Sequence, residues 1–168
     1  MASSVGKTRL SSRAPGHPDT RRGIPLPARV LGLGGLLPFL FGAVMVWCPV
    51  EAMSELGARL LGAYAAVILS FLGGVRWGRL LGDEARLTRW TPLGLSVLPS
   101  LVAWVALLLP DTAMFATLAT GLLLQYLVDR DAAEGGALPP WYGSLRLTLT
   151  AGAVPAVLSG LVARLTLL

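Results

Sequence analysis

The sequence predicts an all-α integral membrane protein, a five-transmembrane-helix bundle with a cytoplasmic N-terminus and a periplasmic C-terminus. Three observations lead to this prediction. Hydrophobic residues make up 54% of the 168 residues and charged residues only 14%, with a mean hydropathy of +0.68, whereas about a quarter of the residues in a soluble domain are charged. Apolar segments of membrane-spanning length then follow one another. Arginines concentrate in alternate connections between those segments.

Residues 1–29 are expected to form a disordered, basic N-terminal tail, because they show no apolar period. The tail contains one acid, Asp19, and six basic residues: Lys7, Arg9, Arg13, Arg21, Arg22 and Arg29. Such an Arg-rich start also fits a mitochondrial transit peptide, and residues 20–22 resemble a twin-arginine signal. We do not expect cleaved export, since no small-residue cleavage site follows a short apolar segment.

The remaining residues, 30–168, are expected to form one transmembrane domain. Its spans are predicted at about 30–48, 56–75, 90–109, 112–128 and 145–165. At a rise of about 1.5 Å per residue these segments are about 26 to 32 Å long, close to the thickness of the hydrocarbon layer. Pro110 predicts a tight break between the third and fourth spans, after which Asp111 or Thr112 is expected to cap the next helix.

The orientation follows from the distribution of Lys and Arg, because short positively charged loops stay on the cytoplasmic side. The tail, the second loop and the fourth loop together carry twelve basic residues, whereas the opposite side has only Arg59 and Arg164. The loop residues in the first group are Arg76, Arg79, Arg86, Arg89, Arg130 and Arg146. Arg59 and Arg164 lie near enough to helix ends to snorkel, so no proton relay or buried ion pathway is predicted.

Small residues recur at every fourth position in two spans, a pattern that lets helix backbones approach closely. The second span carries Gly62, Ala66, Ser70, Gly74 and Gly78, and the fifth carries Ala151, Pro155, Ser159 and Ala163. We expect these two helices to pack together and Pro155 to kink the fifth. Packing within the chain is the favoured interpretation of the stripes, and a partner interface is the alternative.

The C-terminal end of the second span has two interpretations. Trp and Arg at a helix end commonly anchor the helix at the lipid headgroups. Alternatively, two adjacent glycines thin the helix where Arg76 binds an anionic headgroup or a substrate phosphate. Asp129 is expected to pair with Arg146 or Arg76, and an exposed pair would contribute about 0 to 1 kcal/mol. The candidate ligand or lipid-headgroup site comprises Ser70, Gly73, Gly74, Arg76, Trp77, Asp129 and Arg146.

The sequence offers few groups for catalysis. The single histidine, His17, lies in the tail, and no nucleophile-elbow or phosphate-cradling motif is present. We therefore predict no catalytic residues, no cofactor and no metal site, and an enzyme is the less favoured class. Membrane lipids and a protein partner in a membrane complex are the expected partners. Nucleic acid is not, because the basic residues lie at the ends of apolar segments rather than in a binding motif.

The run Ile68-Leu69-Ser70-Phe71-Leu72-Gly73-Gly74-Val75-Arg76-Trp77-Gly78 resembles the signature of the transmembrane protein 69-like family known as domain of unknown function 3429. The segments 34–39 and 141–150 are similar to that family too. The resemblance covers the chain from about residue 29 to its end. It implies a multi-spanning membrane protein found in bacteria and mitochondria, with no assigned activity or site residues.

These observations favour a non-enzymatic accessory or assembly subunit of a larger membrane complex. The alternative is a small carrier, or a membrane protein that binds a lipid or another anionic ligand at the Arg76 end of the second span. The expected location is the bacterial inner (plasma) membrane as a multi-pass protein, with the mitochondrial inner membrane as the alternative.

Overall fold

The computed structural model describes residues 23–82, 90–136 and 138–167, and all regular structure in these ranges is helical. The helices are α1 Leu26–Gly34, α2 Leu37–Val46, α3 Glu51–Leu80, α5 Trp90–Ala106, α6 Asp111–Glu134 and α7 Pro140–Thr166. The fourth and fifth predicted spans lie within α6 and α7, and the second lies within α3. The expectation of a disordered tail concerns mostly residues outside the described ranges.

Four of these helical segments are long and apolar enough to cross a membrane. They comprise α1 and α2 taken together, α3, α6 and α7, whereas α5 is a shorter apolar helix of 17 residues. The first predicted span is divided in two, a break that the sequence analysis did not anticipate. Pro38 lies in the first turn of α2 and has no N–H to continue the helix from α1.

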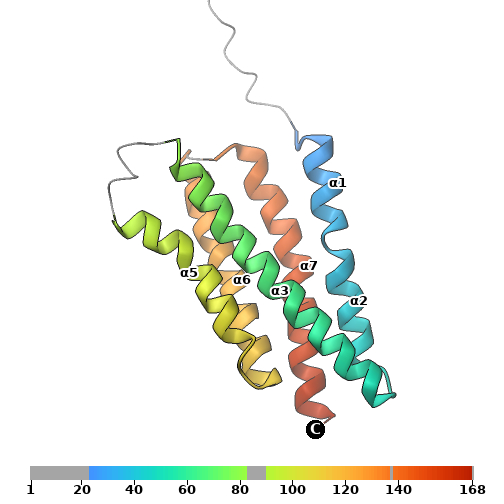
Figure 1. Ribbon diagram of the computed structural model, residues 1–168. Helices are drawn as coiled ribbons and strands as arrows, with labels where there is room; N and C mark the ends of the chain where they lie inside the picture. The colour runs from blue at the N-terminus through green and yellow to red at the C-terminus, as the bar shows by residue number, and fades with distance from the viewer. Residues whose placement is uncertain (1–22, 83–89, 137, 168) are drawn as a thin grey trace, which may run out of the picture.

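Helix α3 occupies the centre of the bundle and runs obliquely across it (Figure 1). It packs mainly against α5 and α2, whereas α7 packs mainly against α6 and then α2. The second and fifth spans, in α3 and α7, are in contact as expected, but each packs more extensively against other helices. The core contains large apolar side chains from α2, α3 and α6, including Phe39, Leu61, Leu69 and Phe115, together with small residues of α5 and α7.

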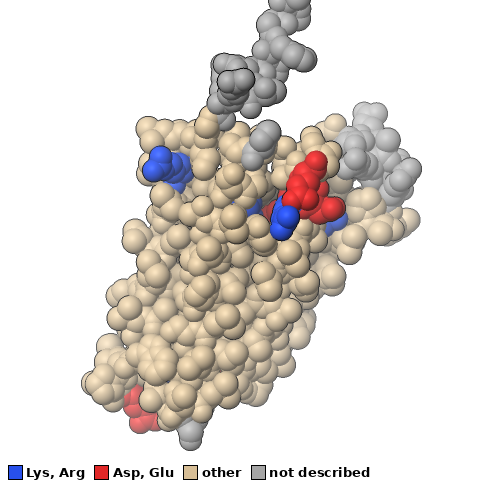
Figure 2. Space-filling model, turned by 180° about the vertical axis from the view of Figure 1, so that it is seen from behind, with Lys and Arg blue, Asp and Glu red and all other residues tan. Residues whose placement is uncertain are grey.

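Charged side chains lie at the two ends of the bundle, with a broad uncharged band between them on the face shown in Figure 2. Large apolar side chains are exposed along the helices, among them Val44, Val67, Phe71 and Leu124. Such a surface would be unfavourable in water and is the surface expected of helices that face lipid. The protein is therefore a helical membrane protein.

The interface between α6 and α7 is a regular antiparallel seam. Residues at alternating steps of four and three face the partner helix, as in a heptad-type interface. On α6 they are Asp111, Phe115, Leu118, Leu122, Gln125 and Asp129, and on α7 they are Arg146, Thr150, Ala153, Val157, Gly160 and Arg164. All of them except Asp111 are buried.

The register of this seam is defined at three levels. Asp111 pairs with Arg164 at one end, and Asp129 pairs with Arg146 at the other. Between them, Gly160 makes room for the ring of Phe115, whose Cζ atom lies 2.9 Å from the position that a Cβ on Gly160 would take. The seam positions nearest the Asp129–Arg146 end are polar on both helices.

Candidate functional site

The Asp129–Arg146 ion pair lies inside the bundle, not on its surface. Arg146 Nε donates a hydrogen bond to Asp129 Oδ2 at 2.9 Å, and the two side chains are only 7% and 11% exposed. Gln125, one turn earlier on α6, donates from Nε2 to Asp129 Oδ1 at 3.4 Å. Of the two partners expected for Asp129, the structure shows Arg146, and the pair is buried, a point that the sequence left open.

This buried pair lies away from the helix ends. Asp129 is five residues before the last residue of α6, and Arg146 is six residues after the first residue of α7. A buried ion pair carries a large desolvation cost, which is offset only when the remaining hydrogen-bonding atoms also find partners. The Nη2 atom of Arg146 is buried without a hydrogen-bond partner in the structure.

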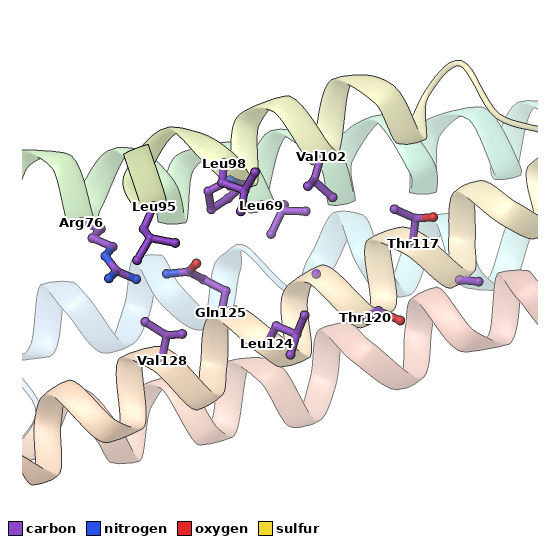
Figure 3. A pocket seen from close by; sticks show the side chains of 13 residues that line it. Leu69, Arg76, Leu95, Leu98, Val102, Thr117, Thr120, Leu124, Gln125 and Val128 are labelled. Carbon is purple, nitrogen blue, oxygen red and sulfur yellow. The ribbon is translucent and has the colours of Figure 1, made fainter. Parts of the chain in front are cut away.

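A pocket of about 470 Å³ lies between α3, α5 and α6 (Figure 3). Its wall is almost entirely apolar and includes Leu69, Leu98 and Val102. At one end the guanidinium of Arg76 and the amide of Gln125 point toward one another. Gln125 Nε2 donates one N–H to Asp129, so its second N–H and the Arg76 guanidinium are the donors that this end of the pocket can offer. The pocket thus has a long apolar body and one cationic, hydrogen-bonding end.

The glycine pair at this end of α3 is divided between two surfaces. Gly73 is buried against α5, and a Cβ at this position would lie 2.6 Å from the carbonyl oxygen of Ser96 and 3.3 Å from Pro99 Cβ. Gly74 is exposed, and a Cβ there would meet nothing within 4 Å. Only Gly73 is therefore needed for a close helix contact, and this contact sets the distance of α5 from Arg76.

The structure brings some of the predicted site residues together and separates others. Asp129 and Arg146 are in contact, and Arg76 reaches the same region through Gln125, which lines its pocket. Ser70 is half-buried, while Gly74 and Trp77 are exposed on another face of α3. Gln125 was missed by the sequence analysis, although its position one turn before Asp129 was the signal for it.

The predicted small-residue stripes are buried over only part of their length. On α3, Gly62 and Ala66 are buried, Gly62 against Met114, whereas Gly74 and Gly78 are exposed. On α7, Ala163 is buried, whereas Ala151 and Pro155 are exposed. Ser159 is half-buried, and its hydroxyl accepts a hydrogen bond from Trp47 Nε1 at 2.9 Å. The closest α7 contacts use the adjacent row that contains Gly152, Ala156 and Gly160.

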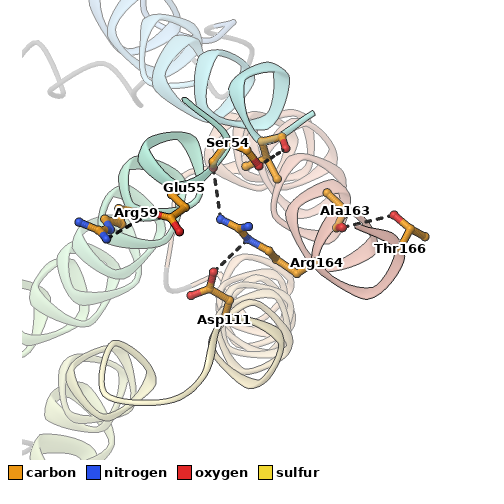
Figure 4. Close-up of polar contacts among 8 residues, drawn as sticks. Ser54, Glu55, Arg59, Asp111, Ala163, Arg164 and Thr166 are labelled. Carbon is orange, nitrogen blue, oxygen red and sulfur yellow. Dashed lines mark hydrogen bonds and ion pairs between the residues drawn. The ribbon is translucent and has the colours of Figure 1, made fainter. Parts of the chain in front are cut away.

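The opposite end of the bundle carries a second ion pair that joins three helices (Figure 4). Arg164 Nε lies 2.9 Å from Asp111 Oδ2, and Arg164 Nη2 donates to the carbonyl oxygen of Ser54 at 3.3 Å. Arg164 is buried, so the expectation that it snorkels is wrong. Asp111 is the first residue of α6 and Pro110 occupies the N-cap position, so the expected capping by Asp111 or Thr112 is wrong.

Arg59 differs from Arg164 at the same end. Its side chain is 79% exposed and lies 3.6 Å from Glu55, one turn earlier on α3. This exposed position agrees with the expected snorkelling. An exposed pair of this kind contributes little to stability, about 0 to 1 kcal/mol.

Comparison with known proteins identifies the family of this chain. Residues 24–162 match the family described as "Protein of unknown function (DUF3429)". The chain belongs to the DUF3429 family. It is also 35% identical over 148 residues to "Transmembrane protein 69" of Xenopus tropicalis, covering 82% of this chain and 54% of that protein. With "Transmembrane protein 69" of Mus musculus it is 28% identical over 132 residues, covering 75% of this chain and 51% of that protein.

This DUF3429 chain thus spans about half the length of the curated relatives that it matches. No solved structure matches it. The family match confirms the resemblance inferred from the residues around Ser70 to Gly78. The matched range contains Asp129, Arg146 and Asp111, and it ends two residues before Arg164.

The polar groups of the pocket between α3, α5 and α6 in this DUF3429 chain can bind anions and hydrogen-bond acceptors. Among the described residues, no group of three or more His, Cys, Asp or Glu side chains is placed to hold a metal ion. The polar side-chain groups that line this pocket are a guanidinium, an amide and two threonine hydroxyls, from Arg76, Gln125, Thr117 and Thr120. Guanidinium and amide groups bind phosphate and carboxylate oxygens by hydrogen bonds.

Proposed function

We propose that this protein binds an anionic amphiphile in the pocket between α3, α5 and α6. The observation that carries the proposal is the position of Arg76 at one end of a largely apolar pocket of about 470 Å³. Ligand pockets commonly combine an apolar wall with a few convergent polar groups that orient the ligand. An alkyl chain would occupy the apolar body, and the anionic group would lie against Arg76 and Gln125.

The charge of the ligand is inferred from the surroundings of Arg76. Within the described ranges, Arg76 makes no ion pair, whereas Arg146 is paired with Asp129. A guanidinium at the end of an apolar pocket favours a ligand that supplies a negative charge. A guanidinium matches the oxygens of a phosphate or carboxylate group with two parallel hydrogen bonds.

The volume of the pocket limits the part of the ligand that it encloses. About 470 Å³ is roughly fifteen times the share of volume of one water molecule in the liquid, about 30 Å³. This space suits one alkyl chain, while the remainder of a two-chain lipid would stay in the bilayer. Thr117 and Thr120 lie toward the end opposite Arg76 and place two hydroxyls along the chain.

The proposal is tested with the full chain purified in a mild detergent, using dioleoylphosphatidylglycerol and dioleoylphosphatidylcholine as probes in native mass spectrometry. The first probe is anionic and the second is zwitterionic, with the same chains. We expect the wild-type protein to retain the anionic probe in preference. Arg76→Gln should weaken its retention about tenfold, since a hydrogen bond to a charged group contributes about 1.5 to 3 kcal/mol.

Two further variants make this test specific. Arg130→Gln changes an exposed arginine that pairs with Glu134 on α6, and it should leave retention unchanged. Ala116→Leu places a larger side chain at the wall of the pocket and should reduce retention. Equal retention of both probes by the wild-type protein, or unchanged retention in Arg76→Gln, would overturn the proposal.

An accessory role in a membrane complex is the second candidate, and one observation favours it. Gly74 and Gly78 are exposed on α3, with open space above each, next to the exposed ring of Phe71. A helix of another protein packs closely on such a surface when small residues line it. Native mass spectrometry separates the two candidates, because a stoichiometric protein that is lost in Gly74→Leu supports this role and a retained lipid supports the first.

We also propose that the end of the bundle with Arg29, Arg76 and Arg130 faces the cytoplasm or the mitochondrial matrix, with the protein in a bacterial inner membrane or a mitochondrial inner membrane. The described residues at this end include five arginines, whereas the opposite end has Arg59 and Arg164. An excess of arginine near short loops favours retention on the inner side. In this orientation the Arg76 pocket opens toward the inner leaflet.

A further inference from the structure

Arg146 has more hydrogen-bonding capacity than its ion pair uses. Its Nε atom donates to Asp129, whereas its Nη2 atom is fully buried and has no partner in the structure. Only 7% of the Arg146 side chain is exposed. A buried donor without an acceptor is unfavourable because it has lost its hydrogen bonds to water, so the position favours an acceptor supplied from outside the chain.

A second cavity, of about 300 Å³, is lined by this same arginine. Its lining residues come from the break between α1 and α2, from those two helices, and from α3, α6 and α7. Its wall is apolar apart from Arg146, Thr150, Tyr64 and the backbone at the break. The Tyr64 hydroxyl donates to the carbonyl oxygen of Gly35 at 2.9 Å, so it closes the break and is already engaged as a donor.

This cavity is distinct from the pocket proposed for the anionic amphiphile. The two share no lining residue: among the core side chains, Leu69 lines the first and Leu122 lines the second. A chain of polar contacts joins them: Gln125 lines the first, Arg146 lines the second, and both hydrogen-bond to Asp129. The second cavity therefore requires its own ligand chemistry.

Arg146, the charged residue that lines the second cavity, is already paired with an acid. Arg146 and Asp129 form a neutral pair in a buried setting. An anionic ligand would leave an uncompensated negative charge there, which is costly away from water. A neutral acceptor, such as a carbonyl oxygen, would satisfy Nη2 without adding charge.

The cavity has a side that opens toward lipid. Leu31 and Phe71 both line it, and they are 76% and 63% exposed. Helix α1 contains no buried residue, so the wall on this side is thin. An apolar molecule can therefore enter from the bilayer between α1 and α3.

We propose that this cavity binds a neutral, apolar molecule through a carbonyl oxygen that accepts a hydrogen bond from Arg146 Nη2. The ester carbonyl of a neutral glycerolipid and the ring carbonyl of a lipid-soluble quinone share this chemistry. A single trapped water would satisfy Nη2, but the cavity is roughly ten times the volume of one water molecule in the liquid, about 30 Å³, and most of its wall is apolar.

The test uses the full chain in detergent and compares four probes of similar chain length by equilibrium binding. Dioctanoylglycerol and decylubiquinone each carry neutral carbonyl groups, decanoate is anionic, and decane has no acceptor. We expect one of the two carbonyl probes to bind at least about tenfold more tightly than decane and decanoate. Which of the two binds identifies the source of the carbonyl.

Infrared difference spectra with a carbon-13 label on the carbonyl provide a second readout. A hydrogen bond from a guanidinium should lower the stretching frequency of the bound carbonyl relative to the free probe. Arg146→Lys keeps a positive charge beside Asp129 but removes the forked guanidinium. It should therefore abolish this shift in a folded protein.

Two alanine-to-leucine variants form a matched pair. Ala153→Leu fills the second cavity, and Ala116→Leu fills the Arg76 pocket. Ala153→Leu should lose binding of the carbonyl probe and keep that of dioleoylphosphatidylglycerol, with the reverse for Ala116→Leu. The inference is overturned if neither carbonyl probe binds better than decane, which indicates a water only, or if both Ala153→Leu and Arg146→Lys bind the probe as the wild type does. Neither result depends on the Arg76 site.

Discussion

Arg164 Nε lies 2.9 Å from Asp111 Oδ2 at one end of the α6–α7 seam, and Arg146 Nε lies at the same distance from Asp129 Oδ2 at the other. The two acids are 18 positions apart on α6, from 111 to 129, and the two arginines are 18 positions apart on α7, from 146 to 164. Eighteen residues are five helical turns and about 27 Å. The two pairs therefore lie on one face of each helix, close to the two boundaries of a hydrocarbon layer about 30 Å thick.

The two arginines should differ in their contribution to stability. Arg146→Ala leaves Asp129 charged and buried, and it should reduce the free energy of unfolding by about 3 to 5 kcal/mol. Arg164→Ala leaves Asp111, whose side chain is 46% exposed, in partial contact with water and should cost about 1 to 2 kcal/mol. Thermal unfolding of both variants in the same detergent measures the difference.

A double variant controls for the loss of packing in this comparison. Asp129→Leu combined with Arg146→Met removes both charges and keeps apolar volume at the seam. It should be more stable than Arg146→Ala alone. If the double variant is as unstable as the single one, the unpaired acid is not the source of the cost.

The register of the seam predicts which positions can be cross-linked. In a chain with Cys48→Ala, cysteines at Leu118 and Val157 should form a disulfide on oxidation, because these positions face each other between the two ion pairs. Cysteines at Leu118 and Leu161, one turn further along α7, should not. Electrophoresis with and without reductant after cleavage of the loop between α6 and α7 reads the result. Preferential cross-linking of the second combination would contradict this register.

The two adjacent glycines of α3 should respond differently to the same substitution. Gly73→Ala places a Cβ 2.6 Å from the Ser96 carbonyl oxygen and should cost about 1 to 3 kcal/mol, as overpacking does. Gly74→Ala meets open space and should be neutral or stabilising by up to about 1 kcal/mol through helix propensity. Unfolding midpoints of the two variants measure this, and a Gly73→Ala variant as stable as Gly74→Ala would contradict the close approach of α5 to α3 at Gly73.

Five crossings predict that the two ends of the chain face different compartments. A short tag at each terminus should react with an impermeant reagent from opposite sides of sealed vesicles. Cysteines in the connections before α3 and after α6 serve as internal controls, because they should label on opposite sides too. Labelling of both termini from the same side would reject the five-crossing topology.

The sequence was sufficient to predict the long helices, because hydrophobic length depends on local composition. The break before Leu37 was missed, although Pro38 signals it, since the flanking residues are as apolar as those of an unbroken span. The role of Asp111 was misread for a related reason. Its position after Pro110 suggests a cap, whereas its partner, Arg164, is distant in sequence and is brought near only by helix packing.

The seam itself was recognisable in principle. The four-and-three spacing of Asp111, Phe115, Leu118, Leu122, Gln125 and Asp129 is present in the sequence. The packing prediction instead used small residues at every fourth position, but such a row drifts around the helix. Gly62 therefore faces Met114 while Gly78 faces open space. The unused donor on Arg146 depends on side-chain geometry, for which a sequence pattern carries no signal.

The locked arginine–aspartate pairs also limit the membranes that suit this protein. A snorkelling side chain adapts to bilayers of different thickness by bending toward water, but Arg146 and Arg164 are held by their partners and cannot do so. In a bilayer much thicker than about 27 Å, the lipids next to α6 and α7 must compress or the helices must tilt. The distance between the two ion pairs along α6 and α7 is therefore fixed, and it favours a thin membrane over a thick, sterol-rich one.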